Sequence, residues 1–238
     1  MKNTEMVELI LDEQNYFIRE AYNTLRTNIL FSGKDVKTIV ITSCIANEGK
    51  TTVSTELAKS LAESGKKVLL LDADLRKSVM VSRYTKVRGL VGLSQVLSGQ
   101  VEVEDAIYKT QIKNLDVIFA GPYPPNPTEL IGSAAFKELL DAKRDQYDYI
   151  LIDAAPLGLV IDAAVMAGVC DGAVLVINSG TVKYRFAQEV KVQLQKSGCR
   201  ILGVVLNKVG RKKLGGHYDG YYDGYGRYYQ ADSKKKKA

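Results

Sequence analysis

The length, composition and charge of the chain exclude several classes of protein. Its 238 residues are 46% hydrophobic and 25% charged, which excludes global disorder, collagen and coiled coil and fits one globular domain with a buried core. The formal net charge of +6 suggests a nucleic acid or an anionic membrane as partner.

Short apolar runs alternate with amphipathic segments along most of the chain. Helical spacing occurs at about Phe17–Phe31 and over Thr51–Ser64, Ser133–Asp145, Asp162–Val169 and Tyr184–Ser197. The apolar runs are typical of strands covered on both faces, and they are Lys37–Thr42, Lys67–Leu71, Leu115–Ala120, Tyr149–Ile152, Gly172–Ile177 and Ile201–Leu206. This alternation predicts an α/β fold with a doubly wound, mostly parallel sheet flanked by helices. Such sheets bind ligands at the carboxyl ends of their strands.

A phosphate-binding loop is predicted directly after the first of these strands. Residues 43–52 read SCIANEGKTT, whose GKT end matches the pattern G-x-x-x-x-G-K-[ST] with Cys44 in place of the first glycine. Such a loop aims backbone N–H groups and a helix N-terminus at phosphates, while its lysine binds their oxygens and its hydroxyl binds Mg²⁺. An ordinary strand-to-helix turn is the alternative. The residues expected at the nucleotide are Ala46, Asn47, Glu48, Gly49, Lys50, Thr51 and Thr52.

Three aspartates follow two of the predicted strands. Asp72 and Asp74 leave the run Lys67–Leu71, and Asp153 leaves the run Tyr149–Ile152. Because the carboxyl ends of parallel strands share one edge, these carboxylates should lie together beside the loop. They would repel one another without a cation, so the sequence predicts Mg²⁺ held by hard oxygen ligands. For each aspartate taken singly, a helix N-cap is the alternative.

The last residues of the chain hold most of its excess charge. Residues 211–238 contain eight basic and three acidic residues, a balance of +5, and the remaining 210 contain 25 and 24, a balance of +1. Without residues 211–238 the protein is therefore nearly neutral. The domains we expect are a globular domain over 1–215 and a disordered tail over 216–238. Only Arg227 lies among the tail aromatics, which disfavours nucleic acid as partner, although an adhesive or nucleic-acid-binding tail is the alternative. Six of the fourteen tyrosines lie in this tail: Tyr218, Tyr221, Tyr222, Tyr225, Tyr228 and Tyr229.

Cysteine usage and hydropathy indicate the compartment. The three cysteines show no CxxC spacing, which favours free thiols in a reducing environment. No run approaches the roughly 20 apolar residues that span a bilayer, and the first residues, MKNTEMVELILDEQ, are too polar for a signal peptide. We expect a cytoplasmic protein.

Three motifs together resemble the bacterial tyrosine kinases, above all the cytoplasmic Gram-positive proteins of capsule and exopolysaccharide synthesis. These motifs are the EGKTT loop and the strand ends LLLDADLR and ILIDAAP; the runs Gly121–Leu130 and Gly203–Asn207 and the tail tyrosines are also similar. The likeness covers about residues 15 to 230. It implies a P-loop NTPase fold and Mg-ATP-dependent phosphorylation of tyrosine.

The resemblance also implies roles for particular residues. Lys50, Asp72 and Asp74 would be catalytic, Thr51 with Asp72, Asp74 and Asp153 would hold Mg²⁺, and Asn207 would contact the base. The six tail tyrosines would be phosphorylated in trans between subunits. Glu20 and Arg26 match the family's E-x-x-R-x-x-R assembly motif, in which Asn23 replaces the first arginine. A solvated helix face is the alternative for these two residues.

The same resemblance implies partners and a setting. The chain would form a homo-oligomer, for which a ring is one arrangement. It would regulate capsular or exopolysaccharide synthesis and export. A separate transmembrane activator would recruit it to the inner face of the plasma membrane, and a cognate phosphotyrosine phosphatase would act on it. Two other functions stay open: a ParA/Min-type regulatory ATPase, whose loop carries a lysine where this chain has Ile45, and a non-catalytic nucleotide-sensing scaffold.

Overall fold

A single sheet forms the centre of the computed structural model, which describes residues 6–12 and 14–209. Its eight strands within this part are β1 Met6–Val7, β2 Thr38–Ser43, β3 Val68–Asp72, β4 Tyr108–Thr110, β5 Leu115–Ile118, β6 Tyr149–Asp153, β7 Gly172–Asn178 and β8 Ile201–Asn207. They lie in the order β1-β4-β5-β3-β6-β2-β7-β8, and only β4 and β5 pair antiparallel. The predicted, mostly parallel P-loop architecture is confirmed. The predicted tail and its six tyrosines lie outside the described residues.

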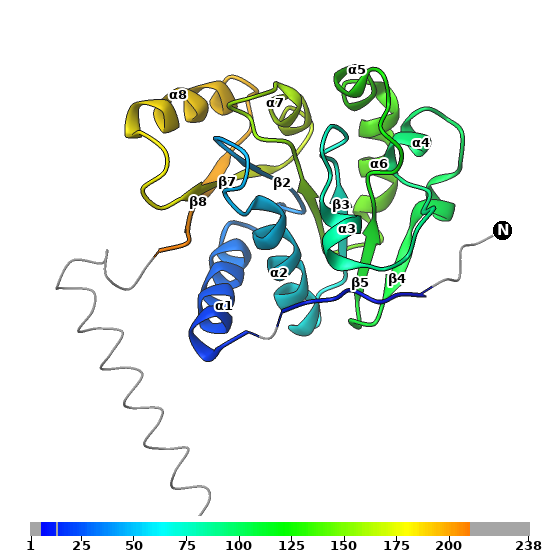
Figure 1. The fold of residues 1–238 in the computed structure, drawn as a ribbon, viewed down its shortest axis with the longest axis horizontal. Helices are drawn as coiled ribbons and strands as arrows, with labels where there is room; N and C mark the ends of the chain where they lie inside the picture. The colour runs from blue at the N-terminus through cyan, green and yellow to red at the C-terminus, as the bar shows by residue number, and fades with distance from the viewer. Residues whose placement is uncertain (1–5, 13, 210–238) are drawn as a thin grey trace, which may run out of the picture.

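Helices cover both faces of this sheet (Figure 1). One face carries α1 Tyr16–Phe31, α2 Lys50–Glu63 and α3 Met80–Tyr84. The other carries α4 Leu93–Leu97, α5 Pro127–Ile131, α6 Ala134–Arg144, α7 Asp162–Ala167 and α8 Tyr184–Gln195. Successive residues of a central strand enter opposite cores: Ile39 packs in the cluster of Leu57 from α2, and Val40 in that of Phe136 from α6. Burial on both faces explains why the strands read as continuous apolar runs.

Between β3 and β6 the chain differs from the sequence prediction. The strand predicted to reach Ala120 ends at Ile118, and β4, α3, α4 and the 3₁₀ turn Val103–Ala106 were not predicted. Each of these elements is at most five residues long, which is too short for a repeated helical or strand pattern to be recognised in the sequence. Helix α5 begins at Pro127 within the proline-rich run, because proline is well suited to the first turn of a helix.

The strand order brings the predicted site residues to one edge. β6 lies between β2 and β3, and their parallel registers pair Asp153 with Ile41 on one side and with Asp72 on the other. The chain leaves β2 into the loop before α2, so that loop and the ends of β3 and β6 are neighbours. This edge is where open α/β sheets bind their ligands.

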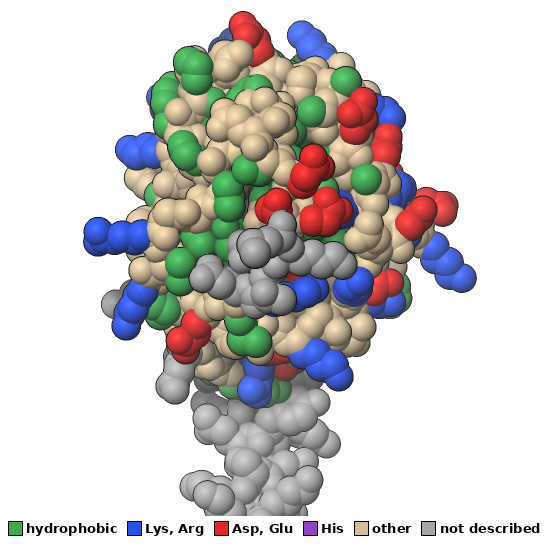
Figure 2. Space-filling model, turned by 90° about the vertical axis from the view of Figure 1, so that its right-hand side faces the viewer, with side chains coloured by type: hydrophobic (Ala, Val, Ile, Leu, Met, Phe, Trp, Pro, Cys, Tyr) green, Lys and Arg blue, Asp and Glu red, His purple; other side chains and the backbone are tan. Residues whose placement is uncertain are grey.

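Charged side chains of both signs lie on the face of the molecule drawn in Figure 2. Figure 2 shows one side of the molecule, on which Lys and Arg side chains occur together with Asp and Glu side chains. Within the described ranges, no helix is both long and apolar enough to cross a membrane.

Candidate active site

The loop between β2 and α2 is built around a buried glutamate. Glu48 is 1% exposed, and one of its carboxylate oxygens accepts the backbone N–H groups of Cys44 and Ile45 at 2.7 and 2.8 Å. The other oxygen accepts the N–H of Asn178 from β7 at 2.9 Å. Charge-assisted bonds of this kind are among the stronger hydrogen bonds in proteins. Glu48, predicted to contact the nucleotide, therefore has its side chain turned into the protein, where it holds the loop.

The end of β8 fixes the same loop from outside. The Asn207 amide donates to the carbonyl of Glu48 at 2.9 Å, and the Lys208 ammonium donates to the carbonyl of Asn47 at 2.8 Å. Asn47 and Gly49 have positive φ, 64° and 93°. A Cβ atom at Gly49 would lie 2.2 Å from the Asn207 amide nitrogen, so this position requires glycine both for its backbone and for its packing.

Lys50 and the aspartates meet across the strand ends. The Lys50 ammonium lies 2.9 Å from Asp74, and Ser54 of α2 donates to Asp153 at 3.2 Å. Asp72 accepts a hydrogen bond from the Ser78 hydroxyl. Its second oxygen, Oδ1, is buried and has no hydrogen-bond partner among the described residues. A buried carboxylate oxygen without a partner is unfavourable and marks a place for a missing ligand or proton.

Burial governs the protonation of these groups. It raises the pKa of Asp72 to about 8, and the neighbouring Asp153 carboxylate adds to the shift. It also raises the pKa of Asp153, against the opposing effect of the Lys50 charge. For Lys50 burial acts to lower the pKa, but the carboxylates of Asp153 and Asp74 outweigh it and the pKa is raised. Lys50 is therefore cationic at neutral pH, and Asp72 is protonated there when no metal ion is bound.

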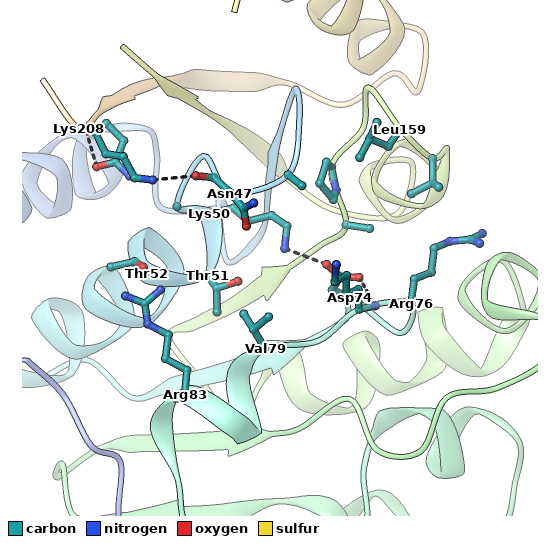
Figure 3. Close-up of a pocket in the computed structure, with 17 residues that line it drawn as sticks. Asn47, Lys50, Thr51, Thr52, Asp74, Arg76, Val79, Arg83, Leu159 and Lys208 are labelled. Atoms are coloured by element: carbon teal, nitrogen blue, oxygen red, sulfur yellow. Dashed lines mark hydrogen bonds and ion pairs between the residues drawn. The ribbon is translucent and has the colours of Figure 1, made fainter. Parts of the chain in front are cut away.

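One cavity of about 530 Å³ brings most of the predicted nucleotide-binding residues together (Figure 3). The predicted residues that line it are Ala46, Asn47, Gly49, Lys50, Thr51, Thr52, Asp74 and Asn207. Asp72 and Asp153 do not line it and lie behind its wall, each 1% exposed. The lining residues that the sequence analysis did not assign to the site are Arg76, Lys77, Val79, Arg83, Ala155, Pro156, Leu159, Val160 and Lys208.

Arg76 links this cavity to the proline-rich segment. Its guanidinium donates to both oxygens of Asp162, at 2.6 and 3.1 Å, and to the Thr128 hydroxyl at 2.7 Å. Thr128 in turn donates to Asp162 at 2.7 Å. Asp162 is 1% exposed, and the bidentate contact fixes the guanidinium plane. The motif LLLDADLR contained this arginine, but the aspartate that holds it is 86 residues away and could not be paired with it from sequence.

The site fits a hard divalent cation. Its donors are the Thr51 hydroxyl and the carboxylates of Asp72, Asp74 and Asp153, and Asp72 Oδ1 lacks a partner. Such oxygen donors suit Mg²⁺. Among the described residues, however, no group of three or more Asp, Glu, His or Cys side chains already surrounds one point. Mg²⁺ commonly keeps several waters and binds phosphate oxygens with only one or two carboxylates, so this arrangement suits a cation that arrives with a nucleotide.

The predicted assembly residues lie on α1. Glu20 is exposed, and the Asn23 amide donates to its carboxylate at 2.9 Å. The Arg26 guanidinium points to α2 of the same chain, where it donates to the carbonyl and the hydroxyl of Ser60 at 3.1 and 3.0 Å. Arg26 therefore has partners within its own chain.

The cysteines are free thiols, as predicted. Cys44, at the place of the first loop glycine, is completely buried, and burial together with the Glu48 charge raises the pKa of its thiol to about 11. It is a small core residue beneath the loop.

A phosphate loop that ends in a lysine, beside aspartates at neighbouring strand ends, defines a P-loop nucleotide-binding protein. A family model described as an AAA domain matches residues 36–189. Tyrosine-protein kinase CpsD of Streptococcus agalactiae is 43% identical over 217 residues, covering 91% of this chain and 92% of that protein. Tyrosine-protein kinase YwqD of Bacillus subtilis is 41% identical over 206 residues, with 85% of each chain covered. The chain belongs to the bacterial tyrosine-protein kinase family of P-loop proteins.

Solved structures show the same fold. The chimerical protein CapA2B2 is 33% identical and has a TM-score of 0.78 over 86% of this chain and 93% of its own. The kinase domain of the Escherichia coli tyrosine kinase ETK is 31% identical, with a TM-score of 0.74 over 81% and 77%. The septum site-determining protein MinD of Pyrococcus horikoshii, complexed with Mg-ADP, is 32% identical with a TM-score of 0.62 over 75% and 72%. The resemblance to bacterial tyrosine kinases is thereby confirmed, and the wider fold is shared with MinD.

Proposed function

We propose that this chain is a Mg-ATP-dependent protein-tyrosine kinase that phosphorylates the tyrosine cluster of its own tail, in trans between subunits. ATP and a tyrosine hydroxyl yield ADP and phosphotyrosine, and the hydroxyl proton is released. Residues 1–215 form the kinase domain, and residues 216–238 form the acceptor tail. One observation carries the proposal: the Lys50 ammonium and the Asp74 carboxylate, 2.9 Å apart, meet in a cavity that the phosphate loop lines.

The geometry supports a distinct role for each group. Lys50 and the loop amides would stabilise negative charge on the transferred phosphoryl group. Thr51, Asp72, Asp74 and Asp153 would hold Mg²⁺, which neutralises phosphate charge when it is bound. Asp74 lines the cavity while Asp72 is buried behind it, so Asp74 is the better placed to accept or orient the tyrosine proton. The pKa of free tyrosine near 10 explains why such help is needed at pH 7.

The wider setting is proposed from the family. The chain is cytoplasmic and regulates capsular or exopolysaccharide synthesis and export. It forms a homo-oligomer through the α1 face that carries Glu20 and Arg26, and a separate transmembrane activator recruits it to the membrane. A cognate phosphotyrosine phosphatase resets the tail, and no nucleic acid takes part. The names of the CpsD and YwqD relatives support the kinase class of this proposal.

Two full-length variants test kinase activity and direction of transfer together. The first, Lys50→Ala, keeps the tail but lacks the phosphate-binding lysine; the second replaces all six tail tyrosines with phenylalanine and keeps the site. When they are mixed with MgATP and an activator's cytoplasmic segment, mass spectrometry should find phosphotyrosine on the Lys50→Ala chain. Either variant alone should stay unphosphorylated in the tail. Phosphate on the parent tail but none on the mixed Lys50→Ala chain would show transfer within one chain.

The likeness to MinD favours a second candidate, a regulatory ATPase without kinase activity. Ile45, where that class carries a lysine, argues against it. ATP hydrolysis by the parent chain with no phosphate on Tyr218–Tyr229 under the same conditions would support the ATPase and overturn the kinase proposal.

A further inference from the structure

A second cavity lies between the segment before α1 and the helices α1 and α2. Its volume is about 450 Å³, and the two helices lie side by side on one face of the sheet (Figure 1). It shares no lining residue with the nucleotide cavity. Its charged lining residues are the acidic Asp12, Glu56 and Glu63 and the basic Arg19 and Lys59.

Glu56 is the buried charge of this cavity. The residue is only 6% exposed, and it forms no hydrogen bond or ion pair with another described residue. A glutamate buried to this degree is normally paired, because an unpaired carboxylate away from water is unfavourable. Since Glu56 also lines the cavity, the space beside it can hold the partner that the described residues do not supply.

Electrostatic interactions place other charges close to Glu56. Burial raises the pKa of Glu56; the Lys59 charge opposes this shift, and the carboxylates of Glu63 and Asp12 add to it. Burial also raises the pKa of Tyr22, and the Glu56 charge adds to that shift. Glu56 therefore lies among two further carboxylates and a neutral phenol, and the negative charge near it exceeds that of the lysine.

A cationic side chain fits this cavity better than a metal ion does. Among the described residues, no group of three or more Asp, Glu, His or Cys side chains surrounds one point, so a metal ion would lack its ligands. An ammonium group needs only one carboxylate and neutral acceptors. The Tyr22 hydroxyl and the Gln14 amide, which also line the cavity, can supply such acceptors, and Leu11 offers apolar surface to a methylene stem.

The tail sequence contains such cations within reach of the cavity. Residues 234–237 are four consecutive lysines. Lys208 binds the loop directly before α2 at 2.8 Å, so the described chain ends beside the start of this helix. Glu56 follows the first residue of α2 by six positions, about 9 Å along the helix axis. The connecting residues 210–233 can span about 80 Å when extended, which is more than this distance requires.

We propose that the cavity between α1 and α2 binds a lysine of the run Lys234–Lys237 from the same chain, with its ammonium group on the Glu56 carboxylate. The tail is then held at two points, at the end of β8 and on α2. Neither Glu20 nor Arg26 lines this cavity, so it is distinct from the proposed assembly residues. Docking of this kind requires no phosphoryl transfer and goes beyond the proposed function.

Carbodiimide crosslinking of the full-length protein tests the contact. The reagent joins a carboxylate and an amine that touch, and mass spectrometry identifies the joined residues. Glu56 should be joined to a lysine of the run in the parent, and this crosslink should be absent in Glu56→Gln. In an equal mixture of isotope-labelled and unlabelled protein, both residues of each pair should carry the same isotope. Pairs of mixed isotope, or no crosslink at Glu56, would overturn docking on the same chain.

A peptide measures the affinity of the same contact. The labelled peptide QADSKKKKA copies residues 230–238, and the acceptor is a full-length variant whose four tail lysines are replaced by glutamine. In this variant, adding Glu56→Gln should weaken binding about tenfold in fluorescence anisotropy, as expected for the loss of a hydrogen bond between charged groups. Glu138→Gln removes an exposed carboxylate on α6. It is the matched control and should leave the affinity unchanged.

Two further comparisons keep the test independent of how Glu56→Gln folds. The peptide QADSQQQQA, which leaves the protein unaltered, should bind at least tenfold more weakly than the lysine peptide. The parent should also bind the lysine peptide more weakly than the variant without tail lysines, because its own tail competes. Equal binding of the two peptides, equal binding by Glu56→Gln and Glu138→Gln, or equal binding by the parent and the variant without tail lysines would each overturn the site.

Discussion

The phosphate loop and the aspartate group lie side by side but differ in how far the chain itself satisfies them. Around the loop, Glu48 accepts three backbone N–H groups, and Asn207 and Lys208 bind two successive carbonyls. In the aspartate group, Asp72 keeps one buried oxygen without a partner among the described residues.

The phosphate loop is therefore preformed, whereas the aspartate group still lacks a ligand or proton for one buried oxygen. A loop with satisfied polar groups keeps its shape before a phosphate arrives, so binding costs little reorganisation. Buried carboxylates that crowd one another are unfavourable until a cation or protons neutralise them. The same sheet edge therefore holds a preformed phosphate loop and a group of crowded carboxylates, and the Lys50–Asp74 contact connects the two.

Replacement of Lys50 should have the largest effect. Lys50→Met should lower the rate of tyrosine phosphorylation by about 10³-fold, because one preorganised charge on the reacting group contributes this order of magnitude. It also leaves Asp74 unpaired, so the double variant Lys50→Met/Asp74→Asn serves as control: it should regain thermal stability but not activity. Activity above a few per cent of the parent rate in either variant would contradict the assigned role.

Replacement of the buried Glu48 should destabilise the preformed loop. Glu48→Gln keeps the size of the side chain but replaces one accepting oxygen with a donor that faces backbone N–H groups. We expect the free energy of unfolding to fall by about 2–3 kcal/mol and the affinity for ATP to fall with it. Urea denaturation and ATP titration measure the two effects. A Glu48→Gln protein as stable as the parent would mean that the loop does not depend on this carboxylate.

The aspartate group should make stability depend on pH. The pKa of Asp72 is about 8 in the folded chain and near 3.8 in the unfolded chain, so the folded chain binds an extra proton between these values. The free energy of unfolding should therefore fall as pH rises from about 4 to 8. Denaturation in EDTA without nucleotide should show a flatter profile for Asp72→Asn, and parallel profiles would contradict the prediction.

The smallest effect is expected on α1. Arg26→Ala should lower the free energy of unfolding by about 1 kcal/mol, because the two hydrogen bonds to Ser60 are lost, whereas Glu20→Ala at the exposed position should not. Sedimentation velocity on both variants shows whether the size of the oligomer changes together with the free energy of unfolding. A smaller oligomer for Arg26→Ala at unchanged stability would place its important contact in another subunit.

Much of the candidate site could be predicted because it follows long, buried strands. Apolar runs located β2, β3 and β6, and the polar residues directly after them fall at one edge in any parallel sheet. Lys77, Val79, Leu159 and Lys208 lie in short elements or connecting segments with no periodicity, so the sequence did not assign them to the cavity. The sequence also did not predict that the Glu48 side chain points into the protein, since the motif fixes the loop backbone but not the direction of that side chain.

The sequence by itself determined the fold class, the phosphate loop and the family, because periodicity and short motifs are local properties of the chain. Only the tertiary structure decided which charged groups have partners. Arg76 pairs with Asp162 and Lys50 with Asp74, whereas one oxygen of Asp72 has no partner among the described residues. The strand order places β6 between β2 and β3, and these contacts depend on that order. Burial then sets the protonation of each carboxylate, and burial is a property of the packed molecule.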